Sequence, residues 1–153
     1  MKRIPVALVA AFATLAFVSA AAADQYFHTA HAELTPIGDA PLRSGFVNDA
    51  HTQGGTIAAQ ERYVLNGALP NTTYTVALWI YPRGSGSCEG TPTFMFTTET
   101  ITTNAAGNGE AGHTFFANPN APPPGLEPTP IKWVVSLNGV PQYETDCVLV
   151  SSG

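Results

Sequence analysis

Short runs of alternating apolar and polar residues, separated by clusters of glycine, proline and asparagine, constrain this chain more than any other feature. The clearest run is Thr73–Tyr81, which carries apolar or aromatic residues on both faces and therefore favours a central, covered strand. Ile57–Leu65 alternates just before it, and the Asn66-Gly67 pair marks a turn between them. No segment shows sustained helical spacing, so the sequence predicts an all-β fold.

The number of such runs predicts how the strands are arranged. The further strand candidates are Tyr26–Leu34, Leu42–Val47, Phe94–Thr103, Glu110–Ala117, Ile131–Asn138 and Gln142–Val150. About eight antiparallel strands are enough for two packed sheets, and we therefore expect an Ig-like or Greek-key β-sandwich. Pro119–Pro130 is rich in proline and is expected to form an exposed loop rather than a central strand.

The first 23 residues have the three parts of a secretory signal peptide. Two basic residues are followed by the apolar stretch Ile4–Val18 and then by the small residues Ala20–Ala23. The alternative is a retained membrane anchor, but this stretch is shorter than the roughly 20 residues that a spanning helix needs. We expect cleavage after Ala23, which leaves residues 24–153 as a single secreted or periplasmic domain, with no second segment able to span a membrane.

The charge of the expected mature chain excludes some classes of partner. Because Lys2 and Arg3 leave with the signal peptide, the 6 basic residues fall to 4 against 11 acidic ones, and the formal net charge falls from −5 to −7. Such an acidic surface repels phosphate backbones and anionic lipid headgroups. We therefore expect no nucleic acid and no anionic membrane surface as a partner.

Cys88 and Cys147 are the two cysteines of the chain, and both lie in the part expected to be exported. In an oxidising compartment such a pair most simply forms one disulfide, which here would close a loop of about 60 residues. The alternative is a metal-binding or catalytic thiol. It is weaker, because no histidine lies close in sequence to either cysteine.

Three stretches resemble a set of small secreted bacterial proteins usually labelled hypothetical. They are Glu61–Ala68 running into Pro70–Tyr74, then Thr102–Gly109, and finally Tyr143–Cys147, and the resemblance covers roughly Gly54–Val150. Those proteins look like β-sandwiches, similar in architecture to chordin-type (CHRD) and copper/zinc superoxide dismutase-like domains. The resemblance implies a sandwich fold. It implies no activity and no catalytic residues.

A copper or zinc site is the main alternative to a metal-free protein, because exported β-sandwiches can hold these ions. The candidate ligands are His28, His31, Asp49 and His51. His28 and His31 are three residues apart and would point to opposite faces of a strand, whereas Asp49 and His51 would share a face. With no His-x-His pair in the chain, we treat exposed or capping histidines as the default and expect no cofactor.

Hydrolytic chemistry is poorly supported. Gly84-Ser85-Gly86-Ser87 superficially resembles a nucleophile turn, but it lacks the second glycine of Gly-x-Ser-x-Gly and leads to Cys88 rather than into a helix. Paired carboxylates could serve a glycosidase, but the acidic residues considered are scattered among positions expected to face solvent: Glu89, Glu99, Glu110, Glu127, Glu144 and Asp146. A secreted hydrolase is therefore disfavoured, and we do not expect an enzyme.

Binding is the better-supported function. Trp79 and Tyr81 share a face of one predicted strand, and aromatic rings on a sheet can stack on sugars or fill a pocket of a partner. The alternative is that they belong to the core, which we expect for Trp133. The sequence thus predicts an exported, non-enzymatic binding or structural module, whose partner is a protein or a carbohydrate at the cell surface.

Overall fold

All secondary structure in the described residues is β-strand, which confirms the predicted fold class. The computed structural model describes residues 28–51, 56–118 and 128–150, so the expected signal peptide lies outside the described part. The strands are β1 (His28–Pro36), β2 (Ser44–His51), β3 (Ile57–Asn66), β4 (Thr73–Ile80), β5 (Phe94–Thr102), β6 (Gly109–Phe116), β7 (Thr129–Leu137), β8 (Val140–Thr145) and β9 (Val148–Val150). No helix that could span a lipid bilayer occurs in this part of the chain.

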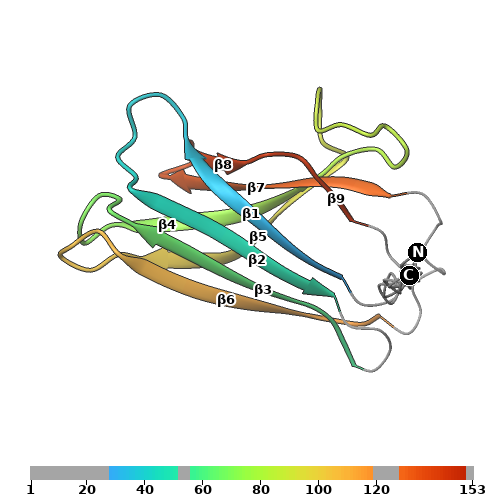
Figure 1. Ribbon diagram of the computed structural model, residues 1–153, viewed down its shortest axis with the longest axis horizontal. Coiled ribbons are helices and arrows are strands. Elements are labelled where there is room, and N and C mark those ends of the chain that lie inside the picture. The colour runs from blue at the N-terminus through green and yellow to red at the C-terminus, as the bar shows by residue number, and fades with distance from the viewer. Residues whose placement is uncertain (1–27, 52–55, 119–127, 151–153) are drawn as a thin grey trace, which may run out of the picture.

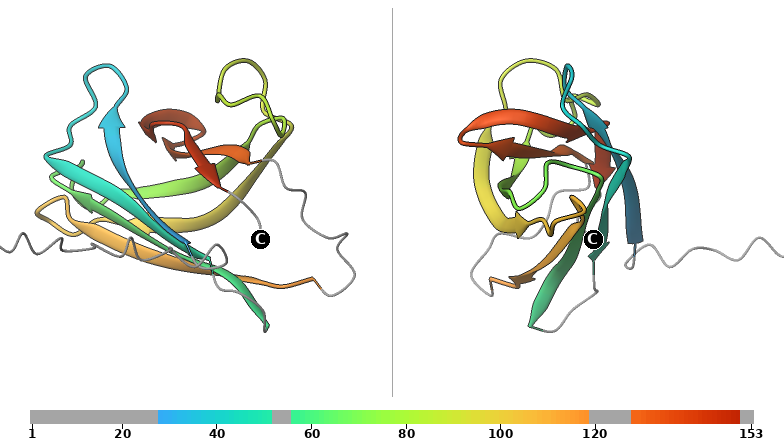
Figure 2. Two further views of the ribbon diagram at one scale, coloured as in Figure 1. Left: turned by 45° about the vertical axis from the view of Figure 1, so that its right-hand side comes forward. Right: turned by 90° about the vertical axis from the view of Figure 1, so that its left-hand side faces the viewer.

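The strands form one antiparallel sheet that curves back on itself. Its order is β5-β4-β7-β8-β1-β2-β3-β6, and β9 pairs with β7. Strand β1 joins two halves, because its residues 28–33 pair with β2 while Leu34–Pro36 pair with β8. The two halves face one another across the interior, and the terminal strands β5 and β6 come together at a seam (Figures 1 and 2).

Two strand boundaries differ from the prediction in ways that matter for the site. The predicted strand Gln142–Val150 is broken at Asp146 and Cys147, because β8 pairs with the end of β7 and β9 pairs with its beginning. The predicted strand Leu42–Val47 instead runs as Ser44–His51, which adds Asp49 and His51 to β2. Most of the expected Pro119–Pro130 loop lies outside the described residues, and its last two residues already belong to β7.

The core lies between the two halves and is built from the inward residues of nearly every strand. Trp133 is fully buried in this core, as expected from the sequence. Around it lie Val47, Tyr63 and Leu65 from one half, and Val76 and Val135 from the other. Strict alternation places these residues on the inner faces, because successive side chains of a strand point to opposite sides.

One end of the core is sealed by a chain of tyrosine hydrogen bonds. The backbone N–H of Leu69 donates to the Tyr74 hydroxyl at 3.2 Å, and the Tyr74 and Tyr143 hydroxyls are 3.2 Å apart. The Tyr143 hydroxyl in turn donates to the carbonyl of Pro41 at 2.9 Å. Each buried hydroxyl at this end therefore has partners, as is usual for buried polar groups.

The turn before β6 yields a stability prediction. Gly107 has a φ of +76°, and a Cβ there would collide with the backbone oxygen of Ala68. Gly139 has a similar φ of +79° but open space around it. We expect Gly107→Ala to lower the free energy of unfolding by about 2–3 kcal/mol and Gly139→Ala by about 1 kcal/mol, as measured by urea denaturation. Equal losses would contradict the collision.

Candidate ligand-binding cavity

A cavity of about 270 Å³ lies at the other end of the core, where β2, β4 and β6 end and β3, β5 and β7 begin. Its wall is mostly apolar and comes from both halves of the sheet, including Ala59, Leu78, Ile80, Phe96, Phe115 and Ile131. The exposed side chain of Arg83, in the segment after β4, lies at its rim. The cavity therefore combines an apolar wall with a small number of polar groups, as ligand sites commonly do.

Two carboxylates are buried among the apolar residues that line this cavity. Asp49 and Glu61 are directly opposite one another in the register of β2 and β3, and they are 1% and 5% exposed. Alternation dictates their direction, because Asp49 shares a face with Val47 and Glu61 shares a face with Tyr63, both of which are core residues. Together with His51 they form what we call the acidic end of the cavity.

Asp49 uses only one of its two oxygens within the protein. His51 Nε2 lies 2.8 Å from Asp49 Oδ2, and this hydrogen bond raises the pKa of the imidazole against the opposing effect of burial. Asp49 Oδ1 is buried and has no hydrogen-bond partner among the described residues. A buried carboxylate oxygen without a donor is costly, and such groups are rare in native structures.

The pKa of Glu61 lies close to neutral pH, so both its protonated and its charged form are populated there. Burial raises its pKa to about 7, and the neighbouring charge of Asp49 acts in the same direction. The Tyr63 hydroxyl donates to Glu61 Oε2 and opposes the rise. The Trp133 indole also lowers this pKa, although Trp133 Nε1 has no partner at hydrogen-bonding distance among the described residues.

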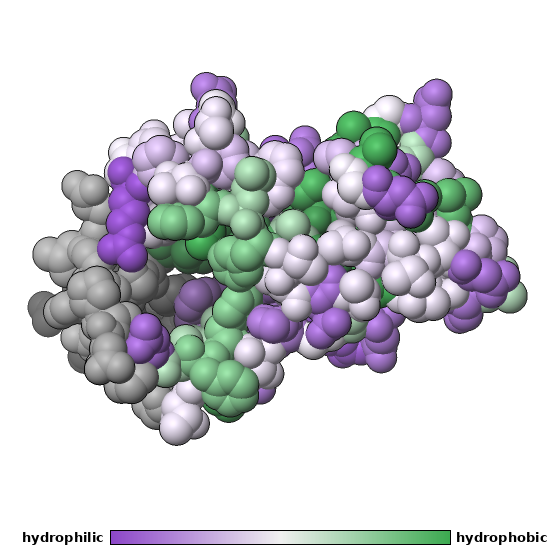
Figure 3. Space-filling view, turned by 180° about the vertical axis from the view of Figure 1, so that it is seen from behind, coloured by the Kyte–Doolittle hydropathy of each residue, from purple (hydrophilic) through white to green (hydrophobic). Residues whose placement is uncertain are grey.

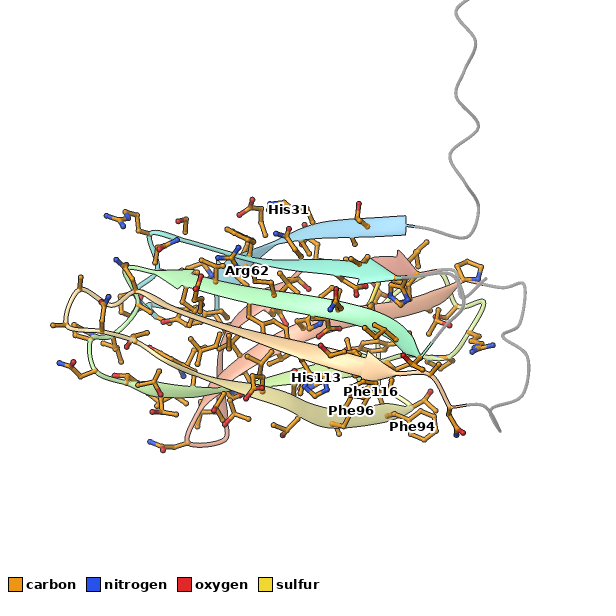
Figure 4. All side chains as sticks on the ribbon, turned by 90° about the horizontal axis from the view of Figure 1, so that it is seen from below. His31, Arg62, Phe94, Phe96, His113 and Phe116 are labelled. Atoms are coloured by element: carbon orange, nitrogen blue, oxygen red, sulfur yellow. A yellow bond between two sulfur atoms is a disulfide. The ribbon has the colours of Figure 1, made fainter. Side chains whose placement is uncertain are left out.

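The seam between β5 and β6 forms one side of the cavity. Phe96 and Phe115 meet there edge to face with ring centroids 6.0 Å apart, and the His113 ring packs against Phe115 at 4.6 Å. Figure 4 shows Phe96 and His113 lying together at this side, with Phe94 and Phe116 nearby. Phe94 and Phe116 are exposed large apolar residues at this end of β5 and β6. Figure 3 shows a band of apolar residues on the surface of the molecule seen from behind. Aromatic contacts thus link the two terminal strands at this end.

The structure separates the two aromatic residues expected to bind a ligand. Tyr81 is 2% exposed, and its backbone N–H bonds to the carbonyl of Pro130. Trp79 is half-buried, on the face of β4 away from the cavity, with Lys132 Nζ 5.3 Å from its ring centroid. They do not form a shared exposed surface.

The four candidate metal ligands are also divided between two places. Asp49 and His51 share the inner face of β2, as predicted, whereas His31 is exposed and bonded to Asn48 and Glu33. Figure 4 shows His31 pointing away from the strands. The backbone of His28 lies opposite His51 in the register of β1 and β2. Within the described ranges, no group of three or more His, Cys, Asp or Glu residues is placed to hold a metal ion.

Glu61 is the site residue that the sequence interpretation missed. A signal for it was present, because Glu61 falls on the same face of the alternating run as Ala59, Tyr63 and Leu65. An acidic residue at an inward position of an otherwise apolar face indicates a buried carboxylate. That signal does not reveal which residue lies opposite, and the proximity to Asp49 comes from the strand pairing.

The predicted disulfide between Cys88 and Cys147 is confirmed, with 5.5 Å between the Cα atoms. It ties the segment between β4 and β5 to the junction of β8 and β9. Both parts contribute to the cavity, because Arg83 precedes Cys88 and Val150 follows Cys147. The disulfide therefore links two parts of the rim.

The fold and the cavity define an all-β protein with one disulfide and an interior site at one end of its curved sheet. Comparisons with protein-family models, with curated proteins and with solved structures find no match. The resemblance to small secreted bacterial β-sandwich proteins stays a prediction.

Proposed function

We propose that this chain is an exported, non-enzymatic binding protein that holds a small ligand in the cavity. The observation that carries this proposal is Asp49, a residue that lines an apolar cavity and whose buried Oδ1 has no donor among the described residues. A ligand that supplies the donor would satisfy this oxygen while its apolar part covers the wall.

The contrast between the two ends of the core supports a binding role over a purely structural one. At the tyrosine end, the hydroxyls of Tyr74 and Tyr143 are joined to one another and to the backbone. At the cavity end, Asp49 Oδ1 and Trp133 Nε1 lack partners within the described residues. Unsatisfied buried groups at one end alone are expected where a ligand completes the site.

Export and the absence of catalysis are supported by separate observations. A structural disulfide persists mainly in oxidising compartments, which agrees with the signal-like first 23 residues. The described cavity lining pairs His51 with Asp49 but has no serine or cysteine, so it holds neither a Ser-His nor a Cys-His nucleophile pair. The apolar wall favours a small ligand over the protein or carbohydrate partner expected from the sequence.

Filling the cavity tests this function. Ala59 is buried in the wall, so Ala59→Leu should occupy space that a ligand needs, whereas Ala105→Leu adds the same atoms in an exposed turn. We expect the wild type, Ala105→Leu and Trp79→Ala to bind 2-phenylethanol with equal affinity in calorimetry, and Ala59→Leu to bind it at least about tenfold more weakly. Unchanged binding by a folded Ala59→Leu variant would place the ligand elsewhere.

A further inference from the structure

We propose that the ligand is an organic cation, a protonated primary amine on a compact apolar body, with its ammonium group bound between Asp49 and Glu61. This inference rests on the proposed binding function and names the class of ligand. Its basis is geometric. Asp49 and Glu61 lie side by side on the inner face of β2 and β3, both line the cavity, and Asp49 Oδ1 lacks a donor within the described chain.

The chemistry of the acidic end favours an ammonium over other polar groups. Carboxylate oxygens only accept hydrogen bonds, and an alkylammonium offers three donors where a hydroxyl offers one. Charge-assisted hydrogen bonds of this kind are about twice as strong as neutral ones. A ligand carboxylate would instead bring a second negative charge close to Asp49. Because Asp49 is more than nine-tenths buried, water would screen this repulsion poorly.

The other charged and titratable groups around the site do not cancel this preference. The imidazole of His51 is bonded to Asp49, and Tyr63 donates to Glu61 rather than carrying charge. His113, opposite Glu61 in the register of β3 and β6, packs against Phe115. Arg83 is the permanently charged cation of the described lining, and it lies at the exposed rim where water screens its charge.

The size and wall of the cavity limit the apolar part of the ligand. A volume of about 270 Å³ exceeds the roughly 150 Å³ hole that accepts benzene and falls just below the range of drug-sized sites. Phe96 and Phe115 line this space and meet edge to face, and such an aromatic wall suits one aromatic or branched aliphatic group. A single ring joined to the amine by a short linker fits these limits.

The protonation of Glu61 makes the preference depend on pH. Since the pKa of Glu61 is about 7, the carboxyl is mostly neutral at pH 5.5 and mostly charged at pH 8. His51, whose pKa is raised by Asp49, loses its proton in the same direction. Both changes make the acidic end more negative as pH rises, so the affinity for a cation should rise with it.

Four ligands with similar bodies and different head groups test the inference: 2-phenylethylamine, 2-phenylethanol, 3-phenylpropanoate and ethylbenzene. At pH 8 we expect the amine to bind about tenfold more tightly than the alcohol, with the carboxylate weakest of the polar three. At pH 5.5 the advantage of the amine over the alcohol should shrink. Equal binding of amine and alcohol, or tightest binding of the carboxylate, would overturn the inference and leave the binding function standing. If none of the four binds, both fall.

Three variants identify the residues responsible. Asp49→Asn should remove most of the amine preference, and Glu61→Gln should reduce it at pH 8 and weaken its dependence on pH. Glu110→Gln removes one negative charge from the exposed outer face of β6, where Glu110 pairs with Arg62. This control should change neither the preference for the amine nor its dependence on pH. A preference that survives in both inner variants, each checked for folding by its thermal midpoint, would contradict the assignment.

The two tryptophans provide a spectroscopic control for position. The indole N–H of Trp133 lies near Glu61, whereas Trp79 is on the face of β4 away from the cavity. In ¹H–¹⁵N correlation spectra, the amine should shift the Trp133 indole resonance and leave that of Trp79 in place. A shift of Trp79 alone would place the ligand outside the cavity and overturn the binding function as well.

Discussion

Replacing Cys88 and Cys147 together by alanine is expected to lower the free energy of unfolding by about 4 kcal/mol. The two cysteines are 59 residues apart in sequence, and the loss follows from the entropy that the unfolded chain regains when a loop of this length is opened. Urea denaturation of the double variant and of the oxidised wild type measures the difference. The wild type treated with a reductant should behave like the double variant.

The position of the disulfide adds a second consequence for the same variant. Strand β9 has only three residues, and it pairs with β7 directly after Cys147. Without the disulfide, β9 and the segment that carries Arg83 lose their covalent connection at the rim of the cavity. We therefore expect weaker binding of 2-phenylethylamine even where the variant is folded. A loss of stability below about 1 kcal/mol, with unchanged binding, would contradict this role.

Stability is expected to fall as pH rises from 5 to 8, and Glu61 contributes about 2–3 kcal/mol of that fall. In the unfolded chain this carboxyl has its ordinary pKa of 4.5, whereas in the folded protein its pKa is about 7. Between these values the folded state binds the proton more tightly, so raising the pH favours unfolding. The stabilisation is fully present below pH 4.5 and is lost as pH rises through 7. His51 acts in the same direction, because its folded pKa is also raised.

Glu61→Gln isolates the contribution of this carboxyl. The amide cannot ionise, so the variant should lose clearly less stability between pH 5 and pH 8 than the wild type. The loss that remains in the variant includes the contribution of His51. Glu110→Gln serves as the matched control and should follow the wild type, because its exposed ion pair with Arg62 contributes little. The measurement is the free energy of unfolding from urea titrations at several pH values. Parallel curves for Glu61→Gln and the wild type would show that Glu61 is not buried in its acidic form.

The residue pattern was sufficient to predict those properties that depend only on neighbours along the chain. Alternation within Ile57–Leu65 and Thr73–Tyr81 predicts the strands to within a residue, because each side chain's face depends only on its position in the run. The same periodicity correctly places Asp49 and His51 on one face. The pairing of Cys88 with Cys147 required no geometry, because the chain has no other cysteine.

Properties that depend on contacts between distant segments were not accessible in this way. The break between β8 and β9 follows from the way both strands share β7, and the buried position of Tyr81 follows from how the halves cover one another. The aromatic pair Trp79 and Tyr81 was expected to act together, but the strand β4 ends at Ile80, and Tyr81 is buried beyond it.

The sequence alone determined that this chain folds as β-strands with one disulfide. Strand periodicity depends only on neighbouring residues along the chain, and two cysteines can form only one intramolecular pair. Only the tertiary structure decided that Asp49 and Glu61 face one another, since their approach depends on the register between β2 and β3. It also decided that an apolar cavity lies beside them, because residues from both halves must meet to form its wall. Burial in that shared interior leaves Asp49 Oδ1 without a donor among the described residues and raises the pKa of Glu61, and neither effect exists in an isolated strand.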